Sequence, residues 1–140
     1  MWDHPPAPTY YHGHVAMMGD AAHASTPFQG QGAGQAIEDA FVLESLFANV
    51  ESVDQIPLAF AAYDRIRRPR SQKVTLTSRE AGELVALRLP SVLDDPEKLK
   101  KDIEWRMDWM WHRDVALEKD QALEIFKTLK EGGELEPVDE

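Results

Sequence analysis

Residues 15–39 read VAMMGDAAHASTPFQGQGAGQAIED, and this stretch decides the fold. It opens within an apolar run, His14–Met18, that closes at Gly19-Asp20. Because polar residues do not alternate within the run, it predicts a strand buried on both faces, as in a parallel sheet. A cluster of alternating glycines and a segment of helical periodicity then follow, at Gly30, Gly32, Gly34 and residues 34–49. The stretch therefore predicts a strand, an exposed-backbone loop and a helix in succession.

Three features of this stretch indicate a ligand site. Asp20 follows the expected strand, at the position where ligands of α/β folds bind, and its carboxylate can accept hydrogen bonds from sugar-like hydroxyls. The glycines allow a ligand to approach the backbone closely. The helix after them begins with unpaired N–H groups, which favour nearby negative charge. The pattern predicts a ligand with a hydroxylated chain and an anionic portion.

The rest of the chain is predicted to be helical. Pro57 favours a helix start, and Pro69 predicts a bend or break in that helix. A third helix is expected over 71–89, closed by Pro90. Two further helices are expected, one after the cap-like Asp94-Asp95-Pro96-Glu97 and one over 114–130. Gly132-Gly133 and the acidic end should fray.

Composition excludes several classes of protein. The 140 residues contain no cysteine, so neither a disulfide framework nor a Cys-ligated metal site is expected. The net charge of −10 argues against a general nucleic-acid binder, since phosphate recognition needs a basic surface. No apolar window is long enough for a membrane span, and the first residues lack a secretory signal, so a cytoplasmic protein is expected.

The stretch closely resembles the second FAD-binding motif of the group A flavoprotein monooxygenases, which have the p-hydroxybenzoate hydroxylase fold, and it looks most like the salicylate hydroxylase branch. The residues that carry the resemblance are Gly19-Asp20-Ala21-Ala22-His23, Pro27, Gly30-Gln31-Gly32 and Glu38-Asp39-Ala40. Further similarity lies in Tyr63-Asp64-Arg65, Arg67-Arg68-Pro69-Arg70 and Ser78-Arg79-Glu80-Ala81-Gly82. The similarity runs from about Trp2 to Trp111.

The resemblance implies roles for these positions. Asp20, next to Gly19, would bind the ribitol chain of FAD. The backbone amides near Gly32, Ala33 and Gly34 would face the N1–C2=O edge of the flavin ring, and Pro27 would lie near its reacting face. Gly30 and Gln31 would also be cofactor-binding positions. NADH or NADPH would be the electron donor, and O2 and a small aromatic ring the substrates. No metal is implied.

The resemblance also implies a C-terminal portion of a larger enzyme. Residues 1–50 would complete an α/β FAD-binding domain, 51–131 would form a helical region, and 132–140 an acidic tail. This chain would then be mostly α-helical with one short buried strand. The N-terminal G-x-G-x-x-G fingerprint of the family is not in these residues, so the missing N-terminal half is an expected partner, and weak or no FAD binding is expected without it.

Other interpretations remain open at this point. His12 and His14, with His23 and Asp20, could ligate a metal, and His23 could act as a base, although a role in bracing the loop is favoured. The basic run from Arg65 to Lys73 could bind phosphate or a neighbouring subunit, although a solvated face with ion pairs is favoured. Trp105, Trp109 and Trp111 could line an aromatic pocket or, by preference, pack a helix against the body. A non-catalytic helical interaction domain with a relic motif is the alternative function.

Overall fold

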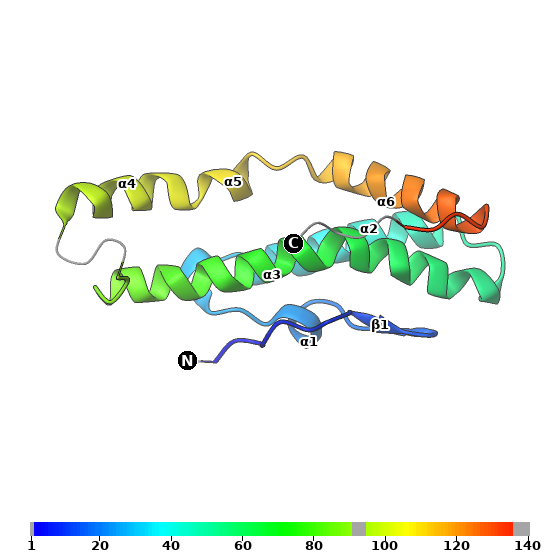
Figure 1. Ribbon diagram of the computed structural model, residues 1–140, viewed down its shortest axis with the longest axis horizontal. Helices are drawn as coiled ribbons and strands as arrows, with labels where there is room; N and C mark the ends of the chain where they lie inside the picture. The colour runs from blue at the N-terminus through cyan, green and yellow to red at the C-terminus, as the bar shows by residue number, and fades with distance from the viewer. Residues whose placement is uncertain (1, 91–94, 136–140) are drawn as a thin grey trace.

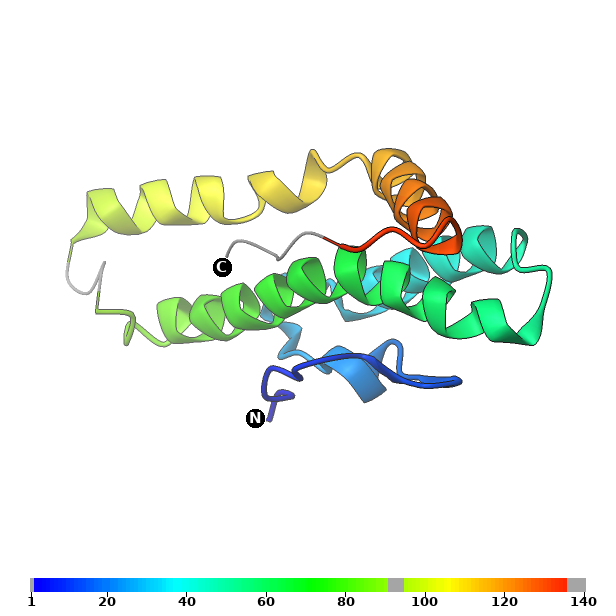
Figure 2. The ribbon, with the colours of Figure 1, turned by 45° about the vertical axis from the view of Figure 1, so that its right-hand side comes forward.

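The computed structural model of the chain describes residues 2–90 and 95–135. Its elements, in chain order, are β1 (Tyr11–His12), β2 (Val15–Ala16), α1 (Asp20–His23), η1 (Pro27–Gln29), α2 (Gly32–Phe47), η2 (Val53–Gln55), α3 (Ile56–Val85), α4 (Pro96–Arg106), α5 (Asp108–Trp111) and α6 (Val115–Lys130). The long helix α3 runs through the middle of the molecule with α2 beside it (Figure 1). The N-terminal segment lies on one side of this pair and α4–α6 on the other, as the turned view also shows (Figure 2).

The main apolar core lies where α2, α3 and α6 meet, with Tyr10 and Ala22 of the N-terminal segment packed against it. Each helix contributes buried residues three or four positions apart, which places them on one face. These residues are Val42 and Leu46 of α2, Ala59, Ala62 and Tyr63 of α3, and Ala122 and Phe126 of α6. The small side chains on α3 and α6 allow the helix backbones to approach closely.

The mostly helical character predicted from the sequence is confirmed, but the single buried strand is wrong. The apolar run instead forms half of a short antiparallel hairpin, in which Tyr11 pairs with Ala16 and His12 with Val15. Gly13 adopts a φ of 57° in the two-residue loop, a conformation that glycine favours. The two strands satisfy each other's backbone groups, and Val15 is 71% exposed. An apolar run without polar alternation is therefore not sufficient evidence of burial.

Helix α3 also differs from the prediction, because it does not break at Pro69. It continues for 30 residues, so the two helices expected on either side of Pro69 are one. Buried residues on both halves hold it in place, among them Tyr63 before the proline and Val74 and Leu84 after it. Tertiary packing on both sides of the proline outweighs the lost backbone hydrogen bond. The helix starts at Ile56-Pro57 as predicted.

The predicted cap of α4 is confirmed where the structure describes it, and α6 has a capping side chain that was not predicted. Asp95 accepts hydrogen bonds from the N–H groups of Glu97 and Lys98 at the start of α4, and Asp114 accepts one from Leu117 in α6. Asp94 and residues 136–140 of the predicted tail lie outside the described residues. In the described parts of the chain, no helix combines the length and apolarity needed to cross a membrane.

The preferred interpretation of the tryptophans as packing residues is wrong for two of them. Trp105 is 64% exposed and Trp111 is 66% exposed. Trp109 is partly buried, and the ammonium of Lys73 lies 4.3 Å from the centre of its ring, within the range of a cation–π contact. The amphipathic pattern of this region was read correctly as helical, but the pattern does not show which side meets the body of the protein.

Candidate functional site

The turn before α1 lies directly against α2. Gly19 is buried and has a φ of 56°, and a Cβ added to it would come within 3.3 Å of Cβ of Ala36. A side chain at this position would be strained by the backbone conformation and crowded by the helix. Asp20 follows as the first residue of α1 and is exposed. Within residues 2–90 and 95–135, its carboxylate receives no hydrogen bond and no ion pair, so it is available to a ligand.

The start of α2 offers the complementary groups. Its N-cap residue, Gln31, provides no capping side chain, and the first helical hydrogen bond runs from the N–H of Gln35 to the carbonyl of Gln31, at 2.9 Å. The N–H groups of Gly32, Ala33 and Gly34 therefore have no acceptor among the described residues. They carry the positive end of the helix dipole.

The loop leading to α2 has exposed residues at both ends of the short helix η1. Pro27 begins the short helix η1 and is exposed, and Gly30 closes that helix at a φ of 63°, also exposed. All the predicted ligand-contacting positions except Gly19 are thus exposed or partly exposed. They lie on the turn, the loop and the helix start that the sequence indicates. Their individual roles remain predictions.

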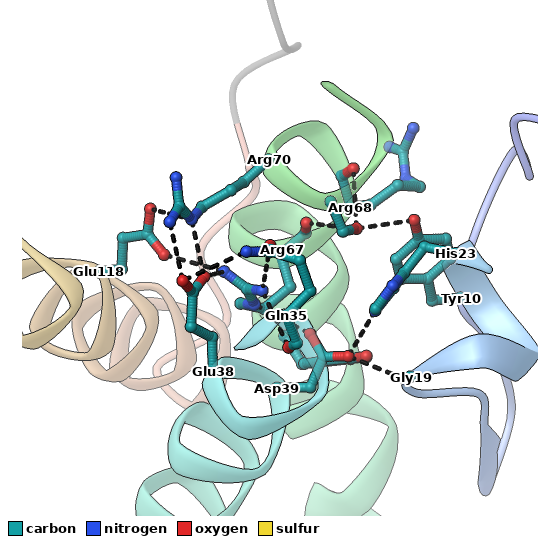
Figure 3. Close-up of polar contacts among 12 residues, drawn as sticks. Tyr10, Gly19, His23, Gln35, Glu38, Asp39, Arg67, Arg68, Arg70 and Glu118 are labelled. Atoms are coloured by element: carbon teal, nitrogen blue, oxygen red, sulfur yellow. Dashed lines mark hydrogen bonds and ion pairs between the residues drawn. The ribbon is translucent and has the colours of Figure 1, made fainter. Parts of the chain in front are cut away.

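The carboxylate of Asp39, buried in the second turn of α2, joins the two parts of this site (Figure 3). Its Oδ2 accepts a hydrogen bond from the N–H of Gly19 at 3.0 Å and lies 2.6 Å from Nε2 of His23. Its Oδ1 accepts from Nε of Arg67 at 2.9 Å. Asp39 therefore connects both ends of the Gly19–His23 turn to α2 and to α3.

His23 has the bracing role favoured from the sequence. The side chain is buried, and its contact with Asp39 fixes the last residue of α1 on the side of α2. His12 and His14 are exposed in and beside the hairpin loop, away from this contact. Among the described residues, no group of three or more His, Asp or Glu side chains is placed to hold a metal ion.

Arg67 of α3 is the centre of the buried network. Its side chain is 0% exposed, and all five of its N–H donors have acceptors. Nε donates to Asp39, Nη1 donates to Glu38 at 2.6 Å and to Glu118 at 3.1 Å, and Nη2 donates to the backbone and side-chain oxygens of Gln35 at 3.2 and 2.8 Å. The guanidinium thus contacts the first turns of α2 and the first turn of α6 at once.

Two more arginines complete the charge balance. Arg70 donates to both oxygens of Glu38, each at 2.7 Å, and Arg113 donates to Glu118. Burial by itself would raise the pKa of Asp39, but the hydrogen bonds from His23 and Gly19 and the charge of Arg67 outweigh it and lower that pKa. The pKa of Glu38 is lowered in the same way, by Arg70 and Arg67. Both carboxylates are therefore held in the charged form.

The sequence does not predict this network. For the basic run it favours a solvated face with ion pairs; the ion pairs are present, but Arg67 and Arg70 are buried. Glu38-Asp39 belongs to the motif that carries the family resemblance, but the motif assigns it no role. A weak signal existed, because Arg67 and Arg70 are three positions apart and share a helical face with the buried Tyr63 and Val74.

Comparison with known proteins shows the family to which this chain belongs. Residues 4–78 match the family described as FAD binding domain. The 6-methylsalicylate 1-monooxygenase of Aspergillus terreus is 47% identical over 134 residues, which are 94% of this chain and 30% of that protein. A salicylate hydroxylase of Pseudomonas putida is 41% identical over 121 residues, which are 86% of this chain and 28% of that protein.

A solved structure of a salicylate hydroxylase in a substrate complex superposes with a TM-score of 0.80 at 50% identity, covering 84% of this chain and 29% of that one. The superposition confirms the predicted FAD-binding fold. The chain spans less than a third of the length of these relatives. The match over more than half of its residues shows that the chain belongs to the FAD binding domain family, in which its relatives are FAD-dependent monooxygenases of the salicylate hydroxylase type.

Proposed function

We propose that this chain forms part of the flavin site of an NAD(P)H-dependent monooxygenase that hydroxylates a phenolic, salicylate-like ring with O2. The observation that carries the proposal is that the carboxylate of Asp20 and the first amides of α2 have no partner among the described residues, while Asp39 of α2 hydrogen-bonds the N–H of Gly19, next to Asp20. The names of the relatives supply the reaction class and the type of aromatic substrate.

The chemistry of these groups fits FAD. The carboxylate of Asp20 can accept hydrogen bonds from the hydroxyls of a ribitol chain, and it has no competing partner among the described residues. The amides of Gly32, Ala33 and Gly34 can donate to the N1–C2=O edge of a flavin ring. The glycines place no large side chain in the way of such a ring. Pro27, exposed on the loop before α2, would lie towards the reacting face.

The start of α2 would also favour the reduced cofactor. Reduction places negative charge at the N1–C2=O edge of a flavin, and unpaired amides at a helix N-terminus stabilise such a charge without rearrangement. When bound, FAD supplies the electron transfer and the oxygen chemistry, and the protein supplies position and electrostatics. The role of this chain is to bind and orient the cofactor.

A second portion of the site is part of the proposal. The G-x-G-x-x-G fingerprint that binds the pyrophosphate of a dinucleotide does not occur in these 140 residues. The relatives are more than three times as long as the matched region. We therefore expect the N-terminal half of the same enzyme to complete the flavin and substrate sites, and these 140 residues alone to bind FAD weakly or not at all.

Replacement of Asp20 tests the proposal. Asp20→Ala in the intact flavoprotein is expected to weaken FAD binding by roughly tenfold or more, because hydrogen bonds to a charged group are lost. The dissociation constant is measured by flavin fluorescence during titration of the apoprotein. Asp54→Ala, at an exposed site on η2, is the matched control and should leave binding unchanged. Equal affinity in Asp20→Ala and the control would favour the alternative, a non-catalytic helical interaction domain.

A further inference from the structure

A buried carboxylate on the last described helix reaches the network under the proposed flavin site. Glu118 lies in the first turn of α6, forty residues beyond the segment that matches the FAD binding domain family. Its residue exposure is 1%, although glutamate is rarely buried unless it is paired. No part of the proposed flavin contact involves α6 directly, so the burial of this charge needs its own explanation.

The contacts of Glu118 explain its burial. One oxygen accepts a hydrogen bond from Nη1 of Arg67 at 3.1 Å, and the other accepts one from Arg113 and lies 3.7 Å from Nε of Arg70. With Glu38 and Asp39, it gives three carboxylates facing three guanidinium groups. Glu118 is thus the third counter-charge of a balanced cluster, and the only one that α6 contributes among the described residues.

A continuous series of contacts leads from Glu118 to the turn that carries Asp20 (Figure 3). Glu118 binds Nη1 of Arg67, and Nε of Arg67 binds Oδ1 of Asp39. Oδ2 of Asp39 then binds the N–H of Gly19, the residue before Asp20. Because a guanidinium is planar and rigid, fixing Nη1 also fixes the direction of Nε. We propose that Glu118 is a positioning residue for the flavin, acting through Arg67 and Asp39.

The inference rests on the proposed flavin site and extends it to a helix outside the family match. Helix α6 is also held by apolar contacts of Ala122 and Phe126, which do not depend on Glu118. Replacing the charge therefore removes one of the two acceptors of Nη1 of Arg67 while leaving these apolar contacts of α6 in place. Loss of one carboxylate also leaves an uncompensated positive charge in the buried cluster next to Asp39.

The test is Glu118→Gln in the intact, flavin-loaded protein. This change keeps the size of the side chain, removes its charge and puts an amide donor where a carboxylate oxygen accepted. We expect the dissociation constant for FAD to rise by about fivefold or more, a typical coupling between separated sites, and the visible spectrum of bound flavin to shift. Glu124→Gln, exposed on the same helix, is the matched control and should change neither. The unfolding free energy of each apoprotein is measured alongside.

A double-mutant cycle with Asp39→Asn separates positioning from general destabilisation. If both residues act through Arg67, their effects on FAD affinity are non-additive; additive effects would overturn the proposal. A Glu118→Gln protein that loses stability yet binds FAD with unchanged affinity and spectrum would also overturn it. Should Glu118→Gln fail to fold, Arg113→Gln, which removes the half-exposed partner of Glu118, is expected to weaken FAD binding to a smaller extent, and unchanged binding would refute the inference. Asp20→Ala tests the flavin site independently, because it does not touch this series of contacts.

Discussion

Replacing Arg67 with methionine is expected to destabilise the protein strongly, because the change leaves buried carboxylates without their partner. Methionine keeps much of the length of the side chain but removes all five donors. Oδ1 of Asp39 and Oε2 of Glu118 each lose their hydrogen bond to a cation, whereas Glu38 keeps its bidentate contact with Arg70. Two oxygens of Gln35 also lose their donor.

The magnitude follows from those losses. A hydrogen bond to a charged group contributes about 1.5–3 kcal/mol, so the two carboxylate contacts together contribute roughly 3–6 kcal/mol. Breaking a buried ion pair from one side costs about 3–5 kcal/mol in other proteins, which agrees with this sum. A domain is stable by about 5–15 kcal/mol, so the variant should lose roughly a fifth of its stability at the least, and most of it if the protein is near the lower end of that range.

Urea unfolding followed by circular dichroism measures the effect. With a denaturant dependence of about 2 kcal/mol per molar urea, a loss of 4 kcal/mol moves the midpoint down by about 2 M. Arg65→Met is the matched control on the same helix, because Arg65 pairs with no residue in the ranges 2–90 and 95–135. The control should stay within about 0.5 kcal/mol of the original protein. A loss below about 1 kcal/mol for Arg67→Met would refute the view that this cluster stabilises the fold.

Three further outcomes are expected. Stability should fall in acid. The pKa values of Glu38 and Asp39 lie below their ordinary 4.5 and 3.8, because the hydrogen bonds and charges of their partners outweigh burial. Their contribution to stability is therefore fully present above the ordinary pKa values and is lost as the pH falls through the lowered pKa values of the folded protein. A flat stability profile below pH 4.5 would contradict this. Pro69→Ala should raise the melting temperature, since an interior proline costs a helix about 3 kcal/mol and its effect on the unfolded chain offsets only about 1; a lower value in a thermal scan would disprove it. Asp95→Ala should weaken α4 by about 1 kcal/mol, seen as faster hydrogen exchange of its first amides, and unchanged exchange would show that the cap contributes little.

Local signals in the sequence predicted most helices correctly. Pro57, Asp95 and Asp114 were identified as helix starts, and each lies at one. The rules failed where neighbours far along the chain decide the outcome. Pro69 predicts a bend or break with separate helices on either side, but contacts on both sides of it keep α3 continuous. The apolar run before Gly19 looked buried, yet composition alone does not distinguish a sheet interior from an exposed hairpin.

The candidate site divides in the same way. Gly19-Asp20 and the glycine-rich start of α2 are short, contiguous motifs, so the sequence indicated them directly. The network beneath them joins residues that are 28 and 51 positions apart, Arg67 with Asp39 and with Glu118. The identity of a charged residue does not show whether its side chain faces solvent or is buried, as that of Arg67 is, at 0% exposure. The number of partners that an arginine finds depends on the packing of three helices, which one-dimensional periodicity does not report.

The cluster around Arg67 also fixes how far the helices can slide along one another. Several of the apolar residues where α2, α3 and α6 meet are alanines, and small side chains interlock little. Apolar contact by itself would therefore allow one helix to shift along the axis of another. A shift of one turn, about 5.4 Å, would carry every carboxylate beyond reach of its arginine. The ion pairs thus select a single axial alignment from several that hydrophobic contact alone would allow. Substitutions in this cluster are therefore expected to be tolerated in concert, as matched pairs, rather than one at a time.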